Sequence, residues 1–388
     1  MSDFRRLSPL ILATGVNIVA LGVTLPILQY FMLHLGGTPF QAALIFSIYS
    51  GCSFLSAPVW GRLSDHWGRK PILLMSIFCT ILSYVWLAVA TDLWEVFASR
   101  AFAGMTAGWL ATSQAFVSDV TKPENRAKGL GLLGAAFGVG FVIGPAVGAI
   151  SVGGADNPNY ALPFFIAAGC TVAGLLITLL LVREPERHVS EIGSRAGTKV
   201  LSDPTTARLL GIYFSVFLIF TGVEGIFALW VKQSFDLGAR DVGYYLAVAG
   251  VVAAIVQGGI VGRAVRRFGE AKVAVAGILF LALGTITLPM VEGASFIYLP
   301  MAFLAAGMSL HNPSMQSLLS RVAPPDWKGG VLGTAQSVSS LARIAGPAAA
   351  GAVFSQIGPN VPYFVGAVLL LPVAVFVISQ MPRFRAAV

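Results

Sequence analysis

Twelve apolar runs, each long enough to cross a lipid bilayer as a helix, follow one another along the chain with short polar clusters between most of them. A bilayer core of about 30 Å needs roughly 20 apolar residues per helix. We therefore predict an all-α membrane protein with twelve transmembrane helices. The predicted spans are 8–30, 41–60, 71–91, 95–119, 127–150, 160–182, 209–231, 241–261, 272–290, 295–320, 329–355 and 361–381.

The composition excludes a soluble protein of this size. Of the 388 residues, 56% are hydrophobic and 11% are charged, and the mean hydropathy is +0.81, whereas a soluble domain carries about 25% charged residues. That much apolar surface cannot be buried in one aqueous core, so the solvent must be lipid. The net charge of +8 does not indicate nucleic-acid binding, because the basic residues lie in short clusters between apolar runs.

The basic residues predict the orientation of the chain in the membrane. If both termini lie on one side, nearly all of the 25 Lys and Arg residues fall on that side, and only Lys232 and Arg240 fall on the other. Arg100 and Arg343 lie inside predicted spans. Because cytoplasmic loops carry an excess of Lys and Arg, we expect both termini in the cytoplasm. For the chain as a whole we expect a bacterial inner membrane.

The sequence gives no sign of an enzyme. Cys52, Cys79 and Cys170 lie inside apolar runs without metal-ligand spacing, so we expect no disulfide and no metal site. The sequence shows no nucleophile–base set, and its glycine-rich segments lack the strand context of a nucleotide-binding fingerprint. We expect no enzymatic activity and no cofactor.

Two sequence matches indicate an internal repeat. The segment GRLSDHWG at 61–68 follows the second span, and GRAVRRFG at 262–269 follows the eighth, 201 residues later. The Gly-Pro pairs at 144–145 and 346–347 lie 202 residues apart in the fifth and eleventh spans. Duplicated bundles are a transporter architecture, because they can move around a central site. We predict two pseudo-symmetric six-helix bundles at 1–182 and 209–388, joined by a cytoplasmic linker at 183–208.

The segment GRLSDHWGRKP at 61–71 is the most specific pattern in the chain. Gly61 and Gly68 permit a tight turn and close helix approach, and Asp65 is placed to accept hydrogen bonds from the N-terminus of a neighbouring helix. Arg69 lies on the predicted cytoplasmic side, where it anchors the turn. A generic basic loop explains the charges but not the positions of Gly, Asp and Pro.

The fifth span carries Gly140, Gly144 and Gly148 at four-residue spacing, together with Pro145. Small residues let helix backbones approach closely, and proline bends a helix. We therefore expect this span to pack tightly against a neighbouring helix.

Arg100 in the fourth span is followed by Gly104 and Gly108. A charged residue inside a span costs at least about 2.5–3.5 kcal/mol on insertion scales, so it needs a partner or a water-filled cavity. We favour such a buried role. The alternative is an arginine that extends to the outer interface.

These patterns resemble the major facilitator superfamily, and over most of the chain they are closest to the drug/proton antiporters of the tetracycline-exporter group. Residues 61–71 resemble its motif A, which in that family latches the two halves in the outward-open state. Arg100 and the glycines after it resemble motif B, and residues 140–148 resemble motif C, which characterises the antiporters. The resemblance implies a secondary active transporter that works by alternating access, and it favours export over import.

The first span departs from that group at Asn17. The resemblance implies an intramembrane aspartate at this position, whereas asparagine does not titrate and cannot carry a coupling proton. Two roles remain open for Asn17, namely hydrogen bonding to a substrate and hydrogen bonding between helices.

Glu224, near the middle of the seventh span, is therefore the first candidate for a proton carrier. A carboxylate in a low-dielectric span is easier to protonate than one in water. Arg343 in the eleventh span is a second charge in the same half. Two interpretations stay open: a fixed ion pair that keeps Glu224 ionised, or a pair for which substrate or proton competes. His311 and Asp119 are further proton-coupling candidates.

Several polar residues inside spans are candidates for lining a substrate cavity, although such residues more often bond to a neighbouring helix. His311 and Asn312 precede Pro313, which frees backbone groups and favours a cavity location. The cavity candidates are Asn17, Arg100, Gln114, Glu224, Gln257, His311, Asn312 and Arg343.

We expect a proton-coupled exporter of small molecules or multiple drugs, with the proton and the surrounding lipid as partners. We expect a monomer, because each chain holds a complete pair of bundles. The alternative on the same fold is a uniporter or importer of a small anionic metabolite, attracted by Arg100 and Arg343. A non-transporting receptor or scaffold is a third hypothesis, and the lack of a sizeable soluble domain counts against it.

Overall fold

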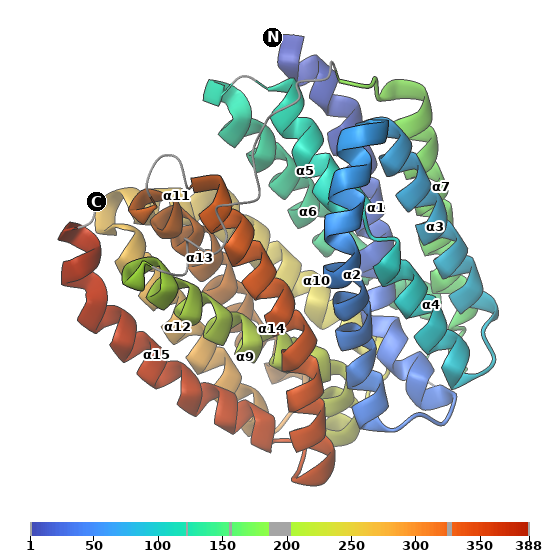
Figure 1. The fold of residues 1–388 in the computed structure, drawn as a ribbon. Helices are drawn as coiled ribbons and strands as arrows, with labels where there is room; N and C mark the ends of the chain where they lie inside the picture. The colour runs from blue at the N-terminus through green and yellow to red at the C-terminus, as the bar shows by residue number, and fades with distance from the viewer. Residues whose placement is uncertain (1, 122, 155–156, 186–202, 324–327, 387–388) are drawn as a thin grey trace. The chain divides into compact units, whose positions relative to one another are not determined.

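The computed structural model describes residues 2–121, 123–154, 157–185, 203–323 and 328–386. In these residues every regular element is a helix, and Figure 1 shows long helices joined by short connections. Ten helical segments are long and apolar enough to cross a membrane. Of the two remaining predicted spans, 95–119 is divided between two shorter helices and 329–355 lies in a helix outside the set of ten. The prediction of an all-α membrane protein is confirmed.

The chain divides into two compact units, and each is described by itself. Unit 1 comprises Met1–Ser190 and Asp236–Gly250, and unit 2 comprises Glu191–Phe235 and Val251–Val388. The main division falls in the predicted linker, of which residues 186–202 lie outside the described part of the chain. Residues 236–250, predicted with the C-terminal bundle, cluster with unit 1.

The helices of unit 1 are drawn from blue to green in Figure 1. The first part of α10 (Ala239–Ile255) also belongs to this unit. The others are α1 (Ser2–His34), α2 (Pro39–Trp67), α3 (Arg69–Val89), α4 (Leu93–Met105), α5 (Trp109–Val120), α6 (Pro123–Val152) and α7 (Ala161–Leu181).

The first helix of unit 2 in the described residues is α9. The predicted eighth span is formed by α10, a short π-helix and α11 in succession, and only its part from Val251 onward belongs to unit 2. The elements of unit 2 are α9 (Pro204–Phe235), the end of α10, the π-helix η1 (Val256–Ile260), α11 (Val261–Phe268), α12 (Glu270–Thr287), the 3-10 turns η2 (Leu288–Met290) and η3 (Ala294–Ile297), α13 (Tyr298–Val322), α14 (Lys328–Gln356) and α15 (Val361–Ala386).

Large apolar side chains lie on the outside of the helices as well as between them. Leu55 on α2 is 75% exposed and Leu180 on α7 is 74% exposed. Lipid tails are as apolar as leucine, so helices in a membrane associate through close packing rather than through the hydrophobic effect. The exposed apolar surface is therefore the expected lipid-facing surface of a membrane protein.

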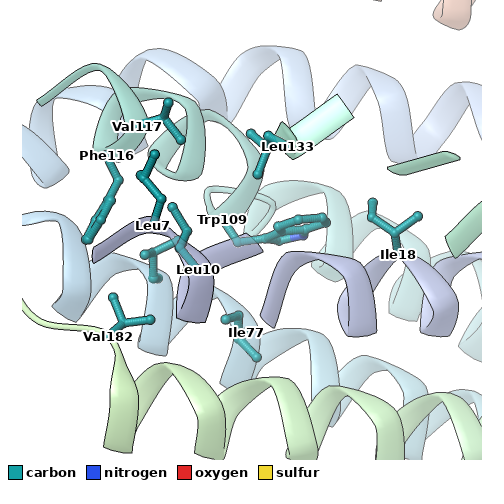
Figure 2. Close-up of a cluster of buried hydrophobic side chains, with 10 residues drawn as sticks. Leu7, Leu10, Ile18, Ile77, Trp109, Phe116, Val117, Leu133 and Val182 are labelled. Carbon is teal, nitrogen blue, oxygen red and sulfur yellow. The ribbon is translucent and has the colours of Figure 1, made fainter. Parts of the chain in front are cut away.

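The packed interior of unit 1 is centred on α1. Leu7, Leu10 and Ile18 are at most 1% exposed and meet Phe116 of α5 and Leu133 of α6 in one buried cluster (Figure 2). This cluster joins α1 to α3 and α5, which carry the charged residues Arg69 and Asp119 described below.

Glycines bring two helices into backbone contact in each unit. In unit 1, a Cβ added at Gly144 of α6 would lie 2.6 Å from the Cα atom of Gly22 of α1. In unit 2, a Cβ added at Gly346 of α14 would lie 2.9 Å from the backbone nitrogen of Gly222 of α9. The two Gly-Pro pairs of the sequence repeat therefore occupy the same kind of close helix crossing.

The predicted span 95–119 is not one helix. The chain leaves the helix between Met105 and Trp109, and the buried hydroxyl of Ser76 on α3 accepts hydrogen bonds from the backbone N–H groups of Gly108 (2.9 Å) and Trp109 (3.0 Å). The same hydroxyl donates to the carbonyl of Thr106. Irregular backbone at membrane depth is tolerated where the protein supplies such partners.

Candidate functional site

The α2–α3 turn is built around the side chain of Arg69. Its Nε donates to Oδ2 of Asp119 on α5 at 2.7 Å, and its Nη1 donates to Oδ1 of Asp65 and to Oγ of Ser64, both on α2, at 2.6 Å. The Arg69 side chain is 15% exposed, that of Asp119 22% and that of Asp65 68%. Arg69 therefore binds the ends of two neighbouring helices to the start of its own.

Gly68 makes this turn possible. Helix α2 continues through residues 61–67, and the chain reverses only at Gly68, where φ is +104°. Such a left-handed value is readily adopted by glycine alone. The prediction that Gly61 shapes the turn is not supported, because Gly61 lies inside α2 and a Cβ there would meet nothing within 4 Å.

Glu184, which follows α7, completes the α2–α3 turn. Its Oε1 accepts a hydrogen bond from the backbone N–H of Arg69 (2.6 Å), and its Oε2 accepts one from the backbone N–H of Lys70 (2.7 Å). A Cβ at Gly68 would lie 2.6 Å from Oε1 of Glu184. Asp65, which was predicted to accept hydrogen bonds from the N-terminus of a neighbouring helix, accepts one from the Arg69 side chain.

Arg100 lies in the interior of unit 1. It is 4% exposed, it donates to the hydroxyl of Ser83 on α3, and its guanidinium carbon lies 5.5 Å from the centre of the Tyr84 ring. Its Nε has no hydrogen-bond partner, and no carboxylate forms an ion pair with it among the described residues. The guanidinium is therefore buried without a counter-ion in that part of the chain.

Asn17 and Gln114 lie in different surroundings. Asn17 is 6% exposed and faces Gly174 of α7, where an added Cβ would lie 2.8 Å from its Oδ1. That Oδ1 has no hydrogen-bond partner in the described structure. Gln114 is exposed on α5.

Three polar side chains meet on one face of unit 2. Asn312 on α13 accepts hydrogen bonds at its Oδ1 from the Tyr213 hydroxyl of α9 and from Nε2 of Gln316, both at 2.8 Å. Phe217, one turn after Tyr213, has its ring centre 4.6 Å from the Tyr213 ring and 5.8 Å from the guanidinium carbon of Arg343 on α14. We call Tyr213, Phe217, Asn312, Gln316 and Arg343 the unit 2 polar–aromatic group.

Glu224 lies on α9 about two turns after Phe217. Its side chain is exposed, although its immediate neighbours Val223 and Gly225 are buried. The positive charge of Arg343 acts on Glu224 through space, but these two residues do not form an ion pair in the described structure. Glu224 is thus an accessible carboxylate in an apolar span with an arginine near it and not fixed to it.

His311 lies in the interior of unit 2. It is 0% exposed, its Nδ1 lies 3.3 Å from the carbonyl of Ala274 on α12, and its ring stacks on Tyr213 at 6.4 Å. Its Nε2 has no hydrogen-bond partner among the described residues. His311 is therefore fully buried and meets the polar–aromatic group through the ring of Tyr213.

Gln257 lies in the π-helix η1, and its Nε2 donates to Oγ of Ser309 on α13 at 3.2 Å. The π-helical turn interrupts the long helix formed by α10 and α11. Such π-bulges occur frequently at functional sites. Among the described residues no group of three or more His, Cys, Asp or Glu side chains is arranged to hold a metal ion.

The comparison with known proteins decides the family. The family model described as Major Facilitator Superfamily matches residues 10–347 and 209–387. The chain belongs to the major facilitator superfamily.

Relatives within this superfamily include drug-resistance proteins. Tetracycline resistance protein, class C, of Escherichia coli is 29% identical over 371 residues, which cover 92% of each protein. Multidrug resistance protein 1 of Bacillus subtilis is 28% identical over 399 residues and covers 99% of each. The crystal structure of the human organic anion transporter MFSD10 matches with a TM-score of 0.73 at 23% identity, over 97% of this chain and 100% of that one. The chain is therefore a transport protein with the major facilitator fold, not an enzyme, and it resembles the tetracycline-exporter group.

The glycine-rich segment of α6 at residues 140–148 packs on α1. Added Cβ atoms at Gly140, Gly144 and Gly148 would meet Ile18, Gly22 and Val23 of that helix, respectively. Pro145 lies inside α6, in the middle of this contact. The glycine spacing therefore corresponds to one continuous helix–helix contact.

Several residues that the structure places in these contacts were absent from the sequence-based candidates, among them Tyr213, Phe217, Gln316, Glu184 and Ser76. Glu184 has a sequence signal, namely a carboxylate directly after the sixth span on the same predicted side of the membrane as residues 61–71. Ser76 has none, because a serine inside an apolar span reads as a small packing residue until the helix break opposite it is known.

Proposed function

We propose that this chain is a proton-coupled exporter of amphiphilic small molecules, working by alternating access in a bacterial inner membrane with both termini in the cytoplasm. The observation that carries the proposal is the exposed carboxylate of Glu224 in the middle of α9, near Arg343 and not paired with it. The tetracycline-resistance and multidrug-resistance relatives support a drug exporter.

Glu224 supplies the proton step in this proposal. A carboxylate in a span is costly while it is charged, so protonation changes the energy of any conformation that moves it between water and apolar surroundings. Arg343 offsets part of the negative charge without holding the carboxylate in an ion pair. Glu224 is therefore free to exchange a proton, which Asn17 cannot do.

The unit 2 polar–aromatic group supplies substrate contacts. Gln316 and Arg343 are exposed and Asn312 is half-buried, so these three side chains can meet a substrate, whereas the rings of Tyr213 and Phe217 are buried and pack beside them. Ligand sites use a few placed polar groups of this kind to orient a bound molecule. Two amides and a guanidinium suit a molecule that carries hydrogen-bonding groups.

Transport in proteoliposomes with an imposed pH gradient tests the proposal, with tetracycline and ethidium as probes. We expect Glu224→Gln to lose gradient-driven transport and to keep exchange of probe in the absence of a gradient. Glu292→Gln is the matched control, because Glu292 is an exposed carboxylate outside the predicted spans. Transport by Glu224→Gln that equals the parent at every gradient would show that Glu224 is not the carrier.

A second candidate is a uniporter or importer of a small organic anion. It is favoured by the buried Arg100, which has no carboxylate partner in the described structure, and by the non-titrating Asn17. The organic anion transporter MFSD10 shares the fold. Carboxyfluorescein exchange that does not depend on a gradient and is abolished by Arg343→Ala would favour this candidate over the exporter.

A further inference from the structure

Unit 2 contains an ion pair at the positions that correspond to Arg69 and Asp119 of unit 1. Gly269, with φ at +83°, ends α11, and α12 begins at Glu270, as Gly68 ends α2 and α3 begins at Arg69. Glu270 lies 201 residues after Arg69, and Arg321 lies 202 residues after Asp119. These are the same distances that relate the two sequence repeats.

Two hydrogen bonds hold the carboxylate of Glu270 in the second pair. Oε1 of Glu270 accepts a hydrogen bond from Nη2 of Arg321 at 2.8 Å and a second from the Ser317 hydroxyl at 3.3 Å. Glu270 is 9% exposed, whereas the Arg321 side chain is 54% exposed. The pair joins the first residue of α12 to the last turn of α13.

The signs of the charges are reversed between the two units. In unit 2 the carboxylate lies at a helix N-terminus and the guanidinium at a helix C-terminus, where the helix dipoles stabilise both. In unit 1 the arginine begins α3 and the aspartate lies in the last turn of α5, where the dipoles oppose both. Glu184 accepts two backbone hydrogen bonds at the start of α3, and its negative charge there offsets this opposition.

We propose that the Glu270–Arg321 pair of unit 2 and the Arg69–Asp119 pair of unit 1, which carry opposite charges at corresponding positions, are two latches, that Glu270 and Arg321 act as positioning residues in the second, and that transport requires both. The Glu270–Arg321 pair is self-sufficient because its charges agree with the helix dipoles. The Arg69–Asp119 pair depends on Glu184. The inference rests on the proposed transport cycle, but not on which ion drives it.

Charge exchange in the full-length protein tests the second latch. The variants are Glu270→Arg, Arg321→Glu and the double exchange, with Arg266→Glu as a control that makes the same charge change at an exposed residue of α11. Hydrogen–deuterium exchange at the start of α12 and the end of α13 reports the contact itself, and ethidium transport in proteoliposomes reports its use.

We expect each single variant to speed hydrogen exchange in these two turns and to lower the maximal rate of ethidium transport about tenfold at unchanged KM, because each leaves a like-charged pair in place of an ion pair. The double exchange should recover both readouts in part, because it restores the ion pair but sets both charges against the helix dipoles, and Arg266→Glu should match the parent. Recovery of hydrogen exchange without recovery of transport, or single variants that transport like the parent, would overturn the inference.

Failure of the proposed function can be distinguished from failure of the second latch. A parent protein that moves no ethidium under any gradient contradicts the exporter proposal for this probe, and the latch is then judged on hydrogen exchange alone. In that case, equal exchange in the single variants and the parent would overturn the latch.

Discussion

Arg69 is held by carboxylates from three separate parts of unit 1. Its side chain binds Asp65 and Asp119, and its backbone N–H binds Glu184. The first two contacts satisfy the guanidinium, and the third satisfies the helix N-terminus, which would otherwise carry unpaired N–H groups next to a positive charge. The position of Arg69 therefore depends on a residue outside the segment 61–71.

Removing the Glu184 carboxylate should loosen the α2–α3 turn. We expect Glu184→Ala to lower the free energy of unfolding by about 1 kcal/mol, the usual cost of losing a helix cap, and to reduce transport. Glu184→Gln should fall between Ala and the parent, because it retains one acceptor oxygen. Thermal unfolding in detergent measures the effect, and a Glu184→Ala protein as stable and as active as the parent would contradict this role.

The charged residues inside the spans could be identified as candidates from the sequence, but their contacts could not be predicted. The charges at Arg100, Glu224 and Arg343 are conspicuous in apolar spans, so they could be singled out. Whether Glu224 pairs with Arg343 depends on the rotation of α9 and α14 about their axes, and apolar positions on all sides of a membrane helix leave that rotation undetermined.

At the scale of the element, the break between α4 and α5 is the clearest departure from the sequence prediction. Gly104 and Gly108 were expected to follow Arg100 in one continuous span, but the chain leaves the helix between Met105 and Trp109. No proline marks the position. The break forms because Ser76, from a different helix, supplies the hydrogen bonds that the backbone loses, and such a tertiary cause has no local sequence signal.

Ser76→Ala should destabilise this break. The substitution leaves the backbone N–H of Trp109 without its acceptor in a buried position, which costs about 1–3 kcal/mol. The N–H of Gly108 keeps its other acceptor, the carbonyl of Thr106 at 2.8 Å. Ser151→Ala is a suitable control, because the Ser151 hydroxyl bonds only to the carbonyl of Gly148 in its own helix. A melting temperature of Ser76→Ala no lower than that of the control would show that the break has another source of stability.

The α1–α6 contact predicts different tolerances along one helix. We expect Gly144→Ala to destabilise unit 1 by about 1–3 kcal/mol through overpacking, because its Cβ would lie 2.6 Å from the Cα of Gly22. Gly134→Ala, in the same helix, meets nothing within 4 Å and should be neutral or slightly stabilising through its higher helix propensity. Equal unfolding temperatures for the two variants would contradict the packing account.

At the scale of the whole molecule, two short sequence matches predicted corresponding features in the two units. The Gly-Pro pairs at 144–145 and 346–347 mark the same helix crossing in each unit, and Gly68 and Gly269 mark the same left-handed turn. These features could be predicted because the same helix crossing and the same turn occur once in each unit. The opposite charges of the two ion pairs could not be predicted from the repeat, because a repeat is recognised by similar residues and the corresponding residues here carry opposite charges.

The central claim is that this chain couples the movement of a small molecule to the movement of protons. The most direct measurement reconstitutes the parent protein in liposomes that contain a pH-sensitive dye and follows tetracycline or ethidium together with the internal pH. The account predicts that an imposed pH gradient drives the probe against its concentration gradient, that added probe moves protons in the opposite direction, and that an ionophore abolishes both. Probe flux that is the same at every imposed gradient, with no accompanying change in internal pH, would contradict it.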